Sequence, residues 1–287
     1  MPREPLVLSV VVAVRDEEYM LPGCLRCLGF ADEVVVVVDD RTTDRSCGIA
    51  VAAGARVLKA AFSDFAALRS EGLDAASGSW VLVVDADERV DARLAREIVQ
   101  ACAAPEQAAY ALRIANVFYG QPMVHGGWAS EAPVRLFPHG SARFVGSVHE
   151  HLEFDDALEV KILAAPLLHF SHRSLEHASS KSATYGELAG RSLYAQSAPT
   201  VTPARMLRIA AYHLFRRLVW KQGWRDGVPG VFEVFRTVTE HLASQVRLWE
   251  LQREADPASI YADLDRRIQV LPARRAKEES RRPDGSP

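Results

Sequence analysis

The segment WVLVVDADERV, residues 80–90, runs from five apolar residues directly into three carboxylates, Asp85, Asp87 and Glu88. Two similar valine-rich runs precede it, LVLSVVVAV at 6–14 and EVVVVVDD at 33–40. Continuous apolar runs of this length are typical of strands buried on both faces, as in a parallel sheet. Helical patterns separate them, so strand and helix alternate four times in about the first hundred residues. We therefore predict an α/β fold with a mostly parallel central sheet and flanking helices.

Further carboxylates follow the other apolar runs. Asp39 and Asp40 end the second run, and RDEE at 15–18 follows the first. Because parallel α/β sheets bind their ligands beyond the carboxyl ends of the strands, we expect these acids to meet on one rim.

Asp85 and Asp87 form a D-x-D pattern, and Mg²⁺ or Mn²⁺ is commonly held by one or two carboxylates together with substrate phosphates. Alternate residues of an extended chain point the same way, so the pattern predicts these two acids in one cluster and Glu88 facing away. A D-x-D triplet is also frequent by chance, and carboxylates that only water solvates would have the same spacing. The residues alone leave both interpretations open.

The composition narrows the class of protein. The chain has 287 residues, is 48% hydrophobic and 25% charged, and carries a formal net charge of −3, so it has no global attraction for nucleic acid. No apolar run reaches the ~18–20 residues that span a bilayer, and the first run ends in RDEE rather than in a cleavage site. We therefore expect a cytoplasmic protein. The lone C-x-x-C of Cys24 and Cys27 is interpreted as packed helix residues rather than a redox or zinc pair.

The pattern changes after the first hundred residues. Residues 108–152 are rich in glycine, histidine and aromatic residues, and 158–174 reads as two more short strands. Helices are predicted at roughly 174–196, 203–222 and 229–251. These patterns predict a first domain over 1–172, divided at about residue 104, then a helical region over 173–251 and a disordered tail over 252–287.

Several segments, in their order along the chain, resemble those of the family 2 glycosyltransferases. They are LSVVVAVRDEEYMLPGCLRCL, ADEVVVVVDDRTTDRS, SGSWVLVVDADERV, HGGW, VRLF and VHE. With PLLHFSHRSLEH and WKQGWRDGVPGVFEV, they look most like the branch that builds lipopolysaccharide core and related surface glycans. The resemblance covers about residues 6–251. It implies the GT-A nucleotide-diphospho-sugar transferase fold and inverting transfer of a hexosyl or heptosyl group in cell-envelope glycan synthesis, with residues 1–104 on the nucleotide-sugar side and 105–172 on the acceptor side.

The same resemblance implies a donor site. Val14, Arg15, Glu17 and Asp39 would hold the nucleoside. Arg69 would approach the base or the diphosphate, and Asp85 would contact the ribose or the sugar. Asp87 would bind a divalent cation, Mg²⁺ or Mn²⁺, on the diphosphate. Arg41 stands where the family has a small residue, so it either touches the nucleotide or only reshapes the turn.

Inverting transfer needs a carboxylate that takes the proton of the acceptor hydroxyl. Two residues compete for this role. Glu150 in VHE lies where other family members carry their catalytic acidic motif, and Glu131 follows HGGW, where the branch has an acidic residue. The order of the motifs favours Glu150.

Other side chains have two interpretations each. His125 and Trp128 of HGGW are predicted to face the acceptor sugar, although Trp128 could equally lie in the core. His149 is a candidate metal ligand, a group that orients the general base, or a loop histidine bonded within the protein. Arg135 in VRLF would pair with the diphosphate or with a structural carboxylate, and His169 and His172 are weaker candidates for a further metal ligand.

The stretch 205–225 is basic, rich in aromatic residues and free of acids until Asp226. It predicts either peripheral contact with an anionic membrane, at the inner face of the cell membrane, or a helix packed on the first domain with a solvated basic face.

The expected partners are a nucleotide-diphospho-sugar donor and a glycan or lipid-linked acceptor. Two other classes of protein stay open. A nucleotidyltransferase of related fold would also use D-x-D, but it normally carries a glycine-rich basic loop after the first strand, where this chain has the acidic VRDEEYM. A non-catalytic sugar-nucleotide-binding protein would have no need for both the intact D-x-D and VHE.

Overall fold

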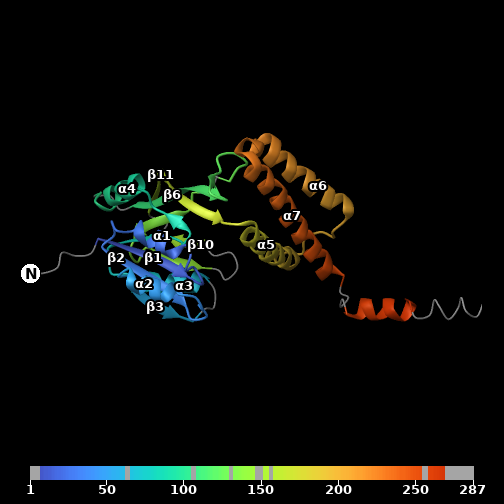
Figure 1. The fold of residues 1–287 in the computed structure, drawn as a ribbon, viewed down its shortest axis with the longest axis horizontal. Helices are drawn as coiled ribbons and strands as arrows, with labels where there is room; N and C mark the ends of the chain where they lie inside the picture. Colours follow the sequence, from blue (N-terminus) through green and yellow to red (C-terminus); the bar gives the residue numbers. More distant parts are fainter. Residues whose placement is uncertain are drawn as a thin grey trace, which may run out of the picture. The chain divides into compact units, whose positions relative to one another are not determined.

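A computed structural model describes residues 7–61, 65–104, 108–128, 132–145, 151–154, 158–253 and 258–268 (Figure 1). The chain divides into two compact units. The first comprises Met1–Lys181 and Tyr212–Thr237, and the second comprises Ser182–Ala211 and Val238–Pro287. Part of the predicted C-terminal helical region therefore belongs to the same compact unit as the sheet. Glu131, His149 and Glu150 lie outside the described residues.

The first unit is built on one mostly parallel sheet. Among the described residues it has nine strands, of which eight lie in the order β3-β2-β1-β4-β8-β6-β11-β5, while β7 pairs with β6. β8 is antiparallel to β4 and β6, and β5 is antiparallel to β11. The strands are β1 (Leu8–Val14), β2 (Glu33–Asp39), β3 (Arg56–Ala60), β4 (Trp80–Val83), β5 (Glu88–Arg89), β6 (Ala108–Phe118), β7 (Gln121–Pro122), β8 (Val134–Pro138) and β11 (Glu159–His172). A separate antiparallel pair is formed by β9 (Ala142–Val145) and β10 (His151–Phe154).

Alternate residues of the central strands enter two separate cores. In β1, Val10 and Val12 belong to one core and Val11 to the other. Helices α1 (Leu21–Arg26), α2 (Ser46–Ala52) and α4 (Ala92–Cys102) contribute to the first core, and α3 (Phe65–Ala75) contributes to the second. Burial on both faces explains why these runs show no polar alternation. The predicted α/β class, with a mostly parallel sheet and flanking helices, is confirmed.

Three local features differ from the sequence-based expectation. Strand β4 stops at Val83, so Asp85 and Asp87 lie in a turn rather than in extended chain. The segment 158–174 forms one strand, β11, instead of two, and its pairing with β6 shifts between Leu163 and Leu167. Pro166 lies within this shift and has no N–H to donate, which explains the interruption of the pattern. Residues 258–268, inside the tail predicted to be disordered, are helical.

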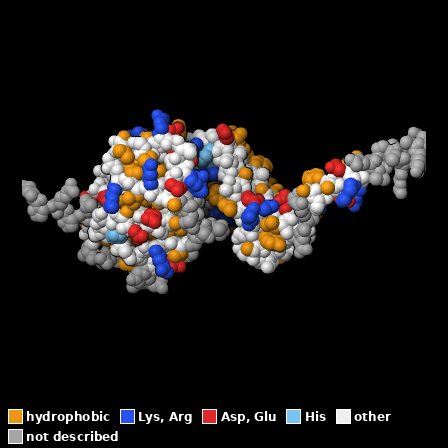
Figure 2. All heavy atoms as spheres, turned by 90° about the horizontal axis from the view of Figure 1, so that it is seen from below, with side chains coloured by type: hydrophobic (Ala, Val, Ile, Leu, Met, Phe, Trp, Pro, Cys, Tyr) orange, Lys and Arg blue, Asp and Glu red, His pale blue; other side chains and the backbone are white. Residues whose placement is uncertain are grey.

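The predicted helical C-terminal region is confirmed. It contains α5 (Leu175–Ala195), α6 (Pro203–Leu214), a π-helical turn η1 (Phe215–Trp220), a 3₁₀ turn η2 (Gly223–Asp226) and α7 (Gly227–Gln252). Within the second unit, the Gln252 side chain at the end of α7 donates to the Ala198 carbonyl oxygen at 3.0 Å. None of the helices that the structure describes is long and apolar enough to cross a membrane. Figure 2 shows basic and acidic side chains interspersed over the displayed face of the first unit, so no single sign of charge dominates that face.

Candidate active site

Acidic residues after β1, β2 and β4 meet at one rim of the sheet, as predicted. The guanidinium Nε of Arg15, just after β1, lies 3.5 Å from Asp39 Oδ2 at the end of β2. Asp87, after β4, lies 3.4 Å from Nε2 of His169 near the end of β11. These strands are parallel, so their carboxyl ends share an edge.

Asp39 is buried and is held mainly by Arg41. The backbone N–H and Nε of Arg41 donate to Oδ1 of Asp39 at 2.9 and 3.2 Å, and its Nη2 donates to Oδ2 at 3.0 Å. The hydrogen bond from the Arg41 side chain is the largest of the effects that lower the pKa of Asp39. Val14 ends β1 and is buried, and Arg15 approaches the same carboxylate from that side. Arg41 therefore shapes the turn after β2, whether or not it also meets a nucleotide.

Asp85, the first acid of the D-x-D, is neutralised by two arginines. Arg69 of α3 donates to its Oδ1 at 2.6 Å, and Arg135 of β8 donates to its Oδ2 at 3.1 Å. Arg135 also donates to Oε1 of Glu88 at 3.0 Å, and Glu88 Oε2 accepts the backbone N–H of Asp85 at 2.8 Å. Glu88 thus faces Asp85 instead of pointing away, because the chain turns here and the alternation of an extended strand does not apply.

Two carboxylates sharing one buried guanidinium acquire different affinities for protons. Burial acts to raise the pKa of Asp85, but Arg135 and Arg69 outweigh it and hold that pKa well below its usual range. Burial, reinforced by the charge of Asp85, raises the pKa of Glu88 to about 7 despite Arg135. Such a pair titrates as a unit. The arrangement keeps Asp85 ionised and oriented at the rim.

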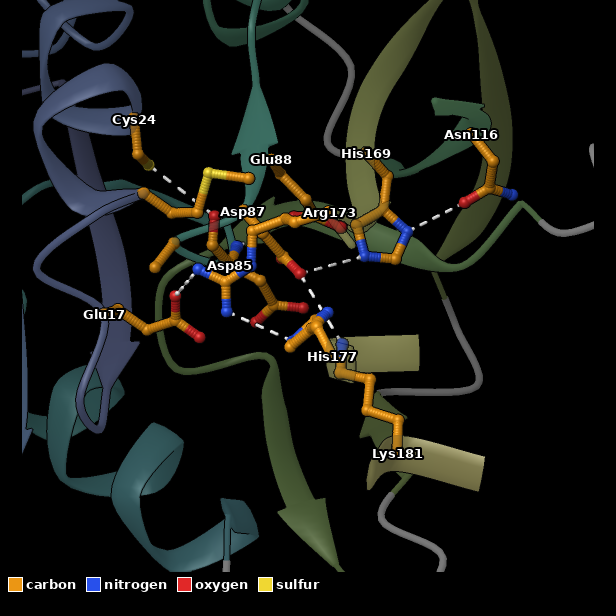
Figure 3. A network of polar contacts seen from close by, with 12 residues as sticks. Glu17, Cys24, Asp85, Asp87, Glu88, Asn116, His169, Arg173, His177 and Lys181 are labelled. Atoms are coloured by element: carbon orange, nitrogen blue, oxygen red, sulfur yellow. Dashed lines mark hydrogen bonds and ion pairs between the residues drawn. The ribbon is translucent and has the colours of Figure 1, made fainter. Parts of the chain in front are cut away.

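Asp87 belongs to a different chain of contacts (Figure 3). His169 Nε2 lies 3.4 Å from its Oδ2, and the other ring nitrogen of His169, Nδ1, lies 2.9 Å from Oδ1 of Asn116. Asn116 Nδ2 in turn donates to the backbone carbonyl of Trp128 at 2.7 Å. Burial opposes ionisation of Asp87, but the contact with His169 lowers its pKa overall. Asp87 and His169 are therefore held side by side, and Asn116 orients the histidine ring through its other nitrogen.

Arg173, which precedes α5, and Lys181 of α5 are cations that border Glu17 and Asp87 (Figure 3). Lys181 Nζ lies 3.9 Å from Asp87 Oδ2, and Arg173 Nη1 lies 3.5 Å from Glu17 Oε2. Arg173 Nη2 also lies 3.1 Å from Nε2 of His177. Burial, with Arg173 and Lys181 nearby, lowers the pKa of His177 to about 4, so this histidine is neutral at pH 7. Burial raises the pKa of Glu17.

Residues from the C-terminal part of the first unit hold the HGGW loop in place. Asp226 of η2 accepts the His125 backbone N–H at 2.8 Å and lies 2.7 Å from His125 Nδ1. Arg217 donates to the Gly126 carbonyl at 3.1 Å, and its guanidinium carbon lies 4.0 Å from the centroid of the Trp128 ring. Trp128 is half-buried, and the guanidinium covers one face of its ring. The contact of Trp128 with an acceptor sugar remains a prediction.

Sequence reasoning did not find several of these residues. Asn116 stands in none of the quoted motifs, and Asp226 lies in WKQGWRDGVPGVFEV without a role assigned to it, so only the fold shows what these two residues contact. Arg173, His177 and Lys181 follow one another at intervals of four residues in HFSHRSLEHASSK. His177 and Lys181 share a face of α5, and Arg173 lies just before the helix, so the sequence contained part of this signal. Among the described residues, no group of three or more His, Cys, Asp and Glu side chains is arranged to hold a metal ion.

Residues 9–138 match the family model described as Glycosyl transferase family 2. The segment contains Asp39, Arg69, Asp85, Asp87 and Arg135, which are the residues that surround the rim. The match covers less than half of the chain and supports a family 2 glycosyltransferase. The match supports a nucleotide-sugar glycosyltransferase. His169, Arg173 and Lys181 lie beyond the matched segment and complete the candidate site.

Individual proteins are similar to parts of the chain. A TPR repeat-containing protein of Synechococcus elongatus is 39% identical over 84 residues, which are 29% of this chain and 21% of that protein. An uncharacterized glycosyltransferase of Rickettsia typhi is 22% identical over 200 residues, covering 66% of this chain and 68% of the relative. The structure of S. aureus TarS residues 1–349 has a TM-score of 0.44 and 14% identity, covering 88% of this chain and 92% of that one. The chain thus spans about a fifth of the length of the first of these relatives.

Proposed function

We propose that this protein is an inverting glycosyltransferase that moves a sugar from a nucleotide-diphospho-sugar to a hydroxyl of a glycan or lipid-linked acceptor. The transfer would be a single displacement at the anomeric carbon, assisted by a divalent cation. The resemblance of the quoted motifs to the lipopolysaccharide core branch supports a role in cell-envelope glycan synthesis and a hexosyl or heptosyl donor.

The observation that carries the proposal is the pairing of Asp87 with His169. A histidine that binds a metal usually donates its other ring N–H to an oxygen of the protein, which fixes the ring and its tautomer. Asn116 Oδ1 accepts from His169 Nδ1 at 2.9 Å in this way and leaves Nε2 facing Asp87. One carboxylate and one imidazole suit Mn²⁺ or Mg²⁺ when phosphate oxygens and water complete the coordination. The residues present therefore fit a cation held on a diphosphate.

The charges around the rim agree with a diphosphate ligand. Asp85 and Glu88 are offset by Arg69 and Arg135. Asp87 and Glu17 are offset by Lys181 and Arg173. The protein side chains are therefore close to neutral as a set, and a divalent cation would bring the positive charge that a diphosphate requires. Lys181 and Arg173 are placed to receive negative charge that develops on the leaving diphosphate.

For the nucleoside, we propose Val14, Arg15, Glu17, Asp39 and Arg41 as the binding residues. Asp39 and Arg15 lie at the ends of neighbouring parallel strands, where such folds bind nucleotides. For the general base, we propose Glu150, with Glu131 as the second candidate. If Glu150→Gln loses transfer while Glu131→Gln keeps it, Glu150 is the base, and the opposite result reverses the assignment.

A membrane surface is the proposed location of the acceptor. Large apolar side chains of the η1–η2 segment are exposed, and Trp220 is 72% exposed. Basic residues Arg216, Lys221 and Arg225 alternate with them and are exposed too. The one acid between residues 203 and 232, Asp226, is buried against His125. A surface with exposed aromatic and basic residues, and no exposed acid, suits the headgroup region of an anionic bilayer.

The deciding experiment is a thermal-shift panel of nucleoside diphosphates and nucleotide-sugars, with and without Mn²⁺. A ligand that binds only the folded state raises the melting temperature. We expect one nucleotide to stabilise the wild type in a metal-dependent manner and Asp87→Asn to lose that stabilisation. Asp74→Asn is the matched control, because Asp74 is an exposed acid on α3. Equal stabilisation of wild type and Asp87→Asn would refute the cation site.

Product analysis separates the remaining classes of protein. A glycosyltransferase releases the nucleoside diphosphate and, with water as a poor acceptor, free sugar of inverted anomeric configuration, which proton NMR detects. A nucleotidyltransferase releases diphosphate or a sugar phosphate instead. Binding of the nucleotide-sugar without any turnover, in the presence of Mn²⁺ and membrane extract, would favour the non-catalytic alternative.

A further inference from the structure

A cavity of about 510 Å³ lies beside the candidate donor site in the first unit. Its walls come from the loop and helix after β1, from β5, and from the carboxyl ends of β6 and β11. It is thus on the same rim as Asp87. One residue, Arg173, borders both places, because its guanidinium faces Glu17 and also lines the cavity.

Of the described residues that line this cavity, three are arginines and none is acidic. Arg26 on α1 is exposed. Within the described part of the chain, Arg89 donates to uncharged acceptors, namely the carbonyl oxygens of Ala86 and Glu88 at 2.9 and 2.7 Å and the carbonyl oxygen and sulfur of Met20. Carbonyl oxygens orient a guanidinium without neutralising it, so the charge of Arg89 remains available to an anion.

Aromatic side chains stand among the arginines. Tyr19 is 79% exposed, and the guanidinium carbon of Arg173 lies 6.0 Å from the centroid of its ring. Phe170 forms another part of the wall, with the guanidinium carbon of Arg89 5.1 Å from its ring centroid. Aromatic rings pack against the apolar face of a sugar or polyol, while arginines bind its charged substituents in a bidentate manner. The cavity therefore combines the two kinds of contact that a phosphorylated carbohydrate needs.

We propose that this cavity binds a phosphate ester carried by the acceptor, with Arg26, Arg89 and Arg173 as its cationic partners. The proposal rests on the proposed glycosyl transfer and narrows the acceptor to an anionic, phosphorylated glycan or polyol. Arg173 connects the two sites, so an acceptor phosphate anchored here would place a neighbouring hydroxyl on the side of the rim where Asp87 and the donor lie.

The test uses the methyl group of Met20 as a local reporter. Met20 lines the cavity, and its sulfur lies 3.7 Å from Nη2 of Arg89, so a bound anion should shift its methyl NMR signal. The chain has 4 methionines, which makes ¹³C-methyl labelling simple to assign. Glycerol phosphate is the probe, and glycerol and inorganic phosphate are the comparison ligands. We expect glycerol phosphate to shift the Met20 signal saturably and glycerol not to do so.

Variants show whether the arginines are responsible for glycerol phosphate binding. Arg26→Gln should weaken glycerol phosphate binding at least fivefold, and Arg96→Gln, which removes an exposed arginine on α4, should leave it unchanged. The signal of buried Met123 verifies that each variant is folded. Lys181→Gln changes the donor site without touching the cavity, so it should keep the Met20 response.

Several results would overturn the proposal. Equal shifts with glycerol and glycerol phosphate would show that the charge of the ligand plays no part in binding. Unchanged affinity of Arg26→Gln for glycerol phosphate would show that the arginines do not bind the phosphate. Loss of the response in Lys181→Gln would place the phosphate in the donor site. Equal affinity for inorganic phosphate would make the cavity a general anion site. The readout needs no nucleotide, so failure of the donor assay and failure of this one are distinguishable.

Discussion

His125 and Asp226 are 101 residues apart in sequence, yet Nδ1 of the histidine lies 2.7 Å from Oδ1 of the aspartate. The other oxygen of Asp226 accepts the backbone N–H of His125 at 2.8 Å. One buried carboxylate therefore fixes both the ring and the backbone of the first residue in HGGW. The C-terminal segment that supplies Asp226 is for this reason part of the candidate active site.

Replacing Asp226 by Asn should loosen this loop. The variant loses charge-assisted hydrogen bonds, which are typically worth about 1.5–3 kcal/mol. We expect urea unfolding to show a loss of stability of this order, and transfer to acceptor to fall while nucleotide affinity stays the same. Asp263→Asn is the control, because its ion pairs with Arg266 and Arg267 are on the surface and should contribute little. Unchanged stability of Asp226→Asn would contradict the role of the pair.

Arg135 is expected to be required for stability only while both Asp85 and Glu88 face it. Arg135→Met leaves Asp85 with Arg69 alone and Glu88 without a cation, and breaking a buried ion pair typically costs about 3–5 kcal/mol. Without Arg135, buried Glu88 must be protonated at pH 7, and Glu88→Gln removes the free-energy cost of that protonation. We therefore expect the double variant to regain part of the stability lost by Arg135→Met, as measured by urea unfolding. A double variant no more stable than the single one would show that the packing of Arg135, not its charge, is what matters.

Asn116 is predicted to tune the affinity for the divalent cation without touching it. Asn116→Ala frees Nδ1 of His169, and loss of such an orienting partner typically lowers metal affinity by about 10- to 100-fold. Isothermal titration of Mn²⁺ in the presence of a nucleoside diphosphate measures this directly. Gln121→Ala is the control, since the Gln121 amide donates to the carbonyl oxygen of Asp226 and does not reach His169. Equal Mn²⁺ affinity in wild type and Asn116→Ala would contradict the assignment.

Glu233 of α7 should make the stability of the first unit depend on acidity. Its buried carboxylate accepts from the Tyr119 hydroxyl at 2.7 Å and from Nε of Arg236 at 2.7 Å, and lies 3.0 Å from Nδ1 of His172. Burial opposes its ionisation, but His172 and Arg236 lower its pKa below the ordinary 4.5. A carboxyl whose pKa is lower in the folded protein stabilises it above pH 4.5, and this contribution is lost as the pH falls through the folded pKa.

Two variants test this sign. Glu233→Gln should unfold more easily at pH 7 and should show a smaller loss of stability than wild type between about pH 5 and pH 3, because it has no group to protonate. Tyr119→Phe removes one donor and keeps the carboxylate, so it should lose about 1 kcal/mol and retain the acid dependence of the wild type. Parallel pH profiles of Glu233→Gln and wild type would show that folding does not lower the pKa of this carboxyl.

The exposed aromatic residues of η1 and η2 should bind anionic bilayers. We expect the protein to sediment with vesicles containing phosphatidylglycerol, and added salt to weaken this binding, because each basic residue near the surface contributes about 1 kcal/mol. Changing Trp220 and Trp224 to Ser should reduce the bound fraction. Tyr261→Ser is the control, as Tyr261 is an equally exposed aromatic residue on the helix at 258–268. Binding to neutral and anionic vesicles alike would argue against an electrostatic contribution.

The amino-acid sequence determined the sheet and the position of its acids. A strand that is buried on both faces of a parallel sheet is apolar along nearly its whole length, so it can be recognised from neighbouring residues alone. The runs at 6–14, 33–40 and 80–84 have this pattern. The direction of the strands then places Asp39, Asp85 and Asp87 at one rim. Since these rules depend only on neighbouring residues, the sequence suffices for them.

The orientation of each acid was decided by the tertiary structure alone. The strand ends before Asp85, and the turn that follows directs Glu88 toward Arg135 of β8 and Asp87 toward His169 of β11. Likewise, Asp226 and Glu233 reach the first unit only because the chain returns to it after α6. Hydrogen bonds and ion pairs act over a few ångströms in space and leave no periodic pattern along the chain, so the contacts that define this site appear only once the fold has brought their partners together.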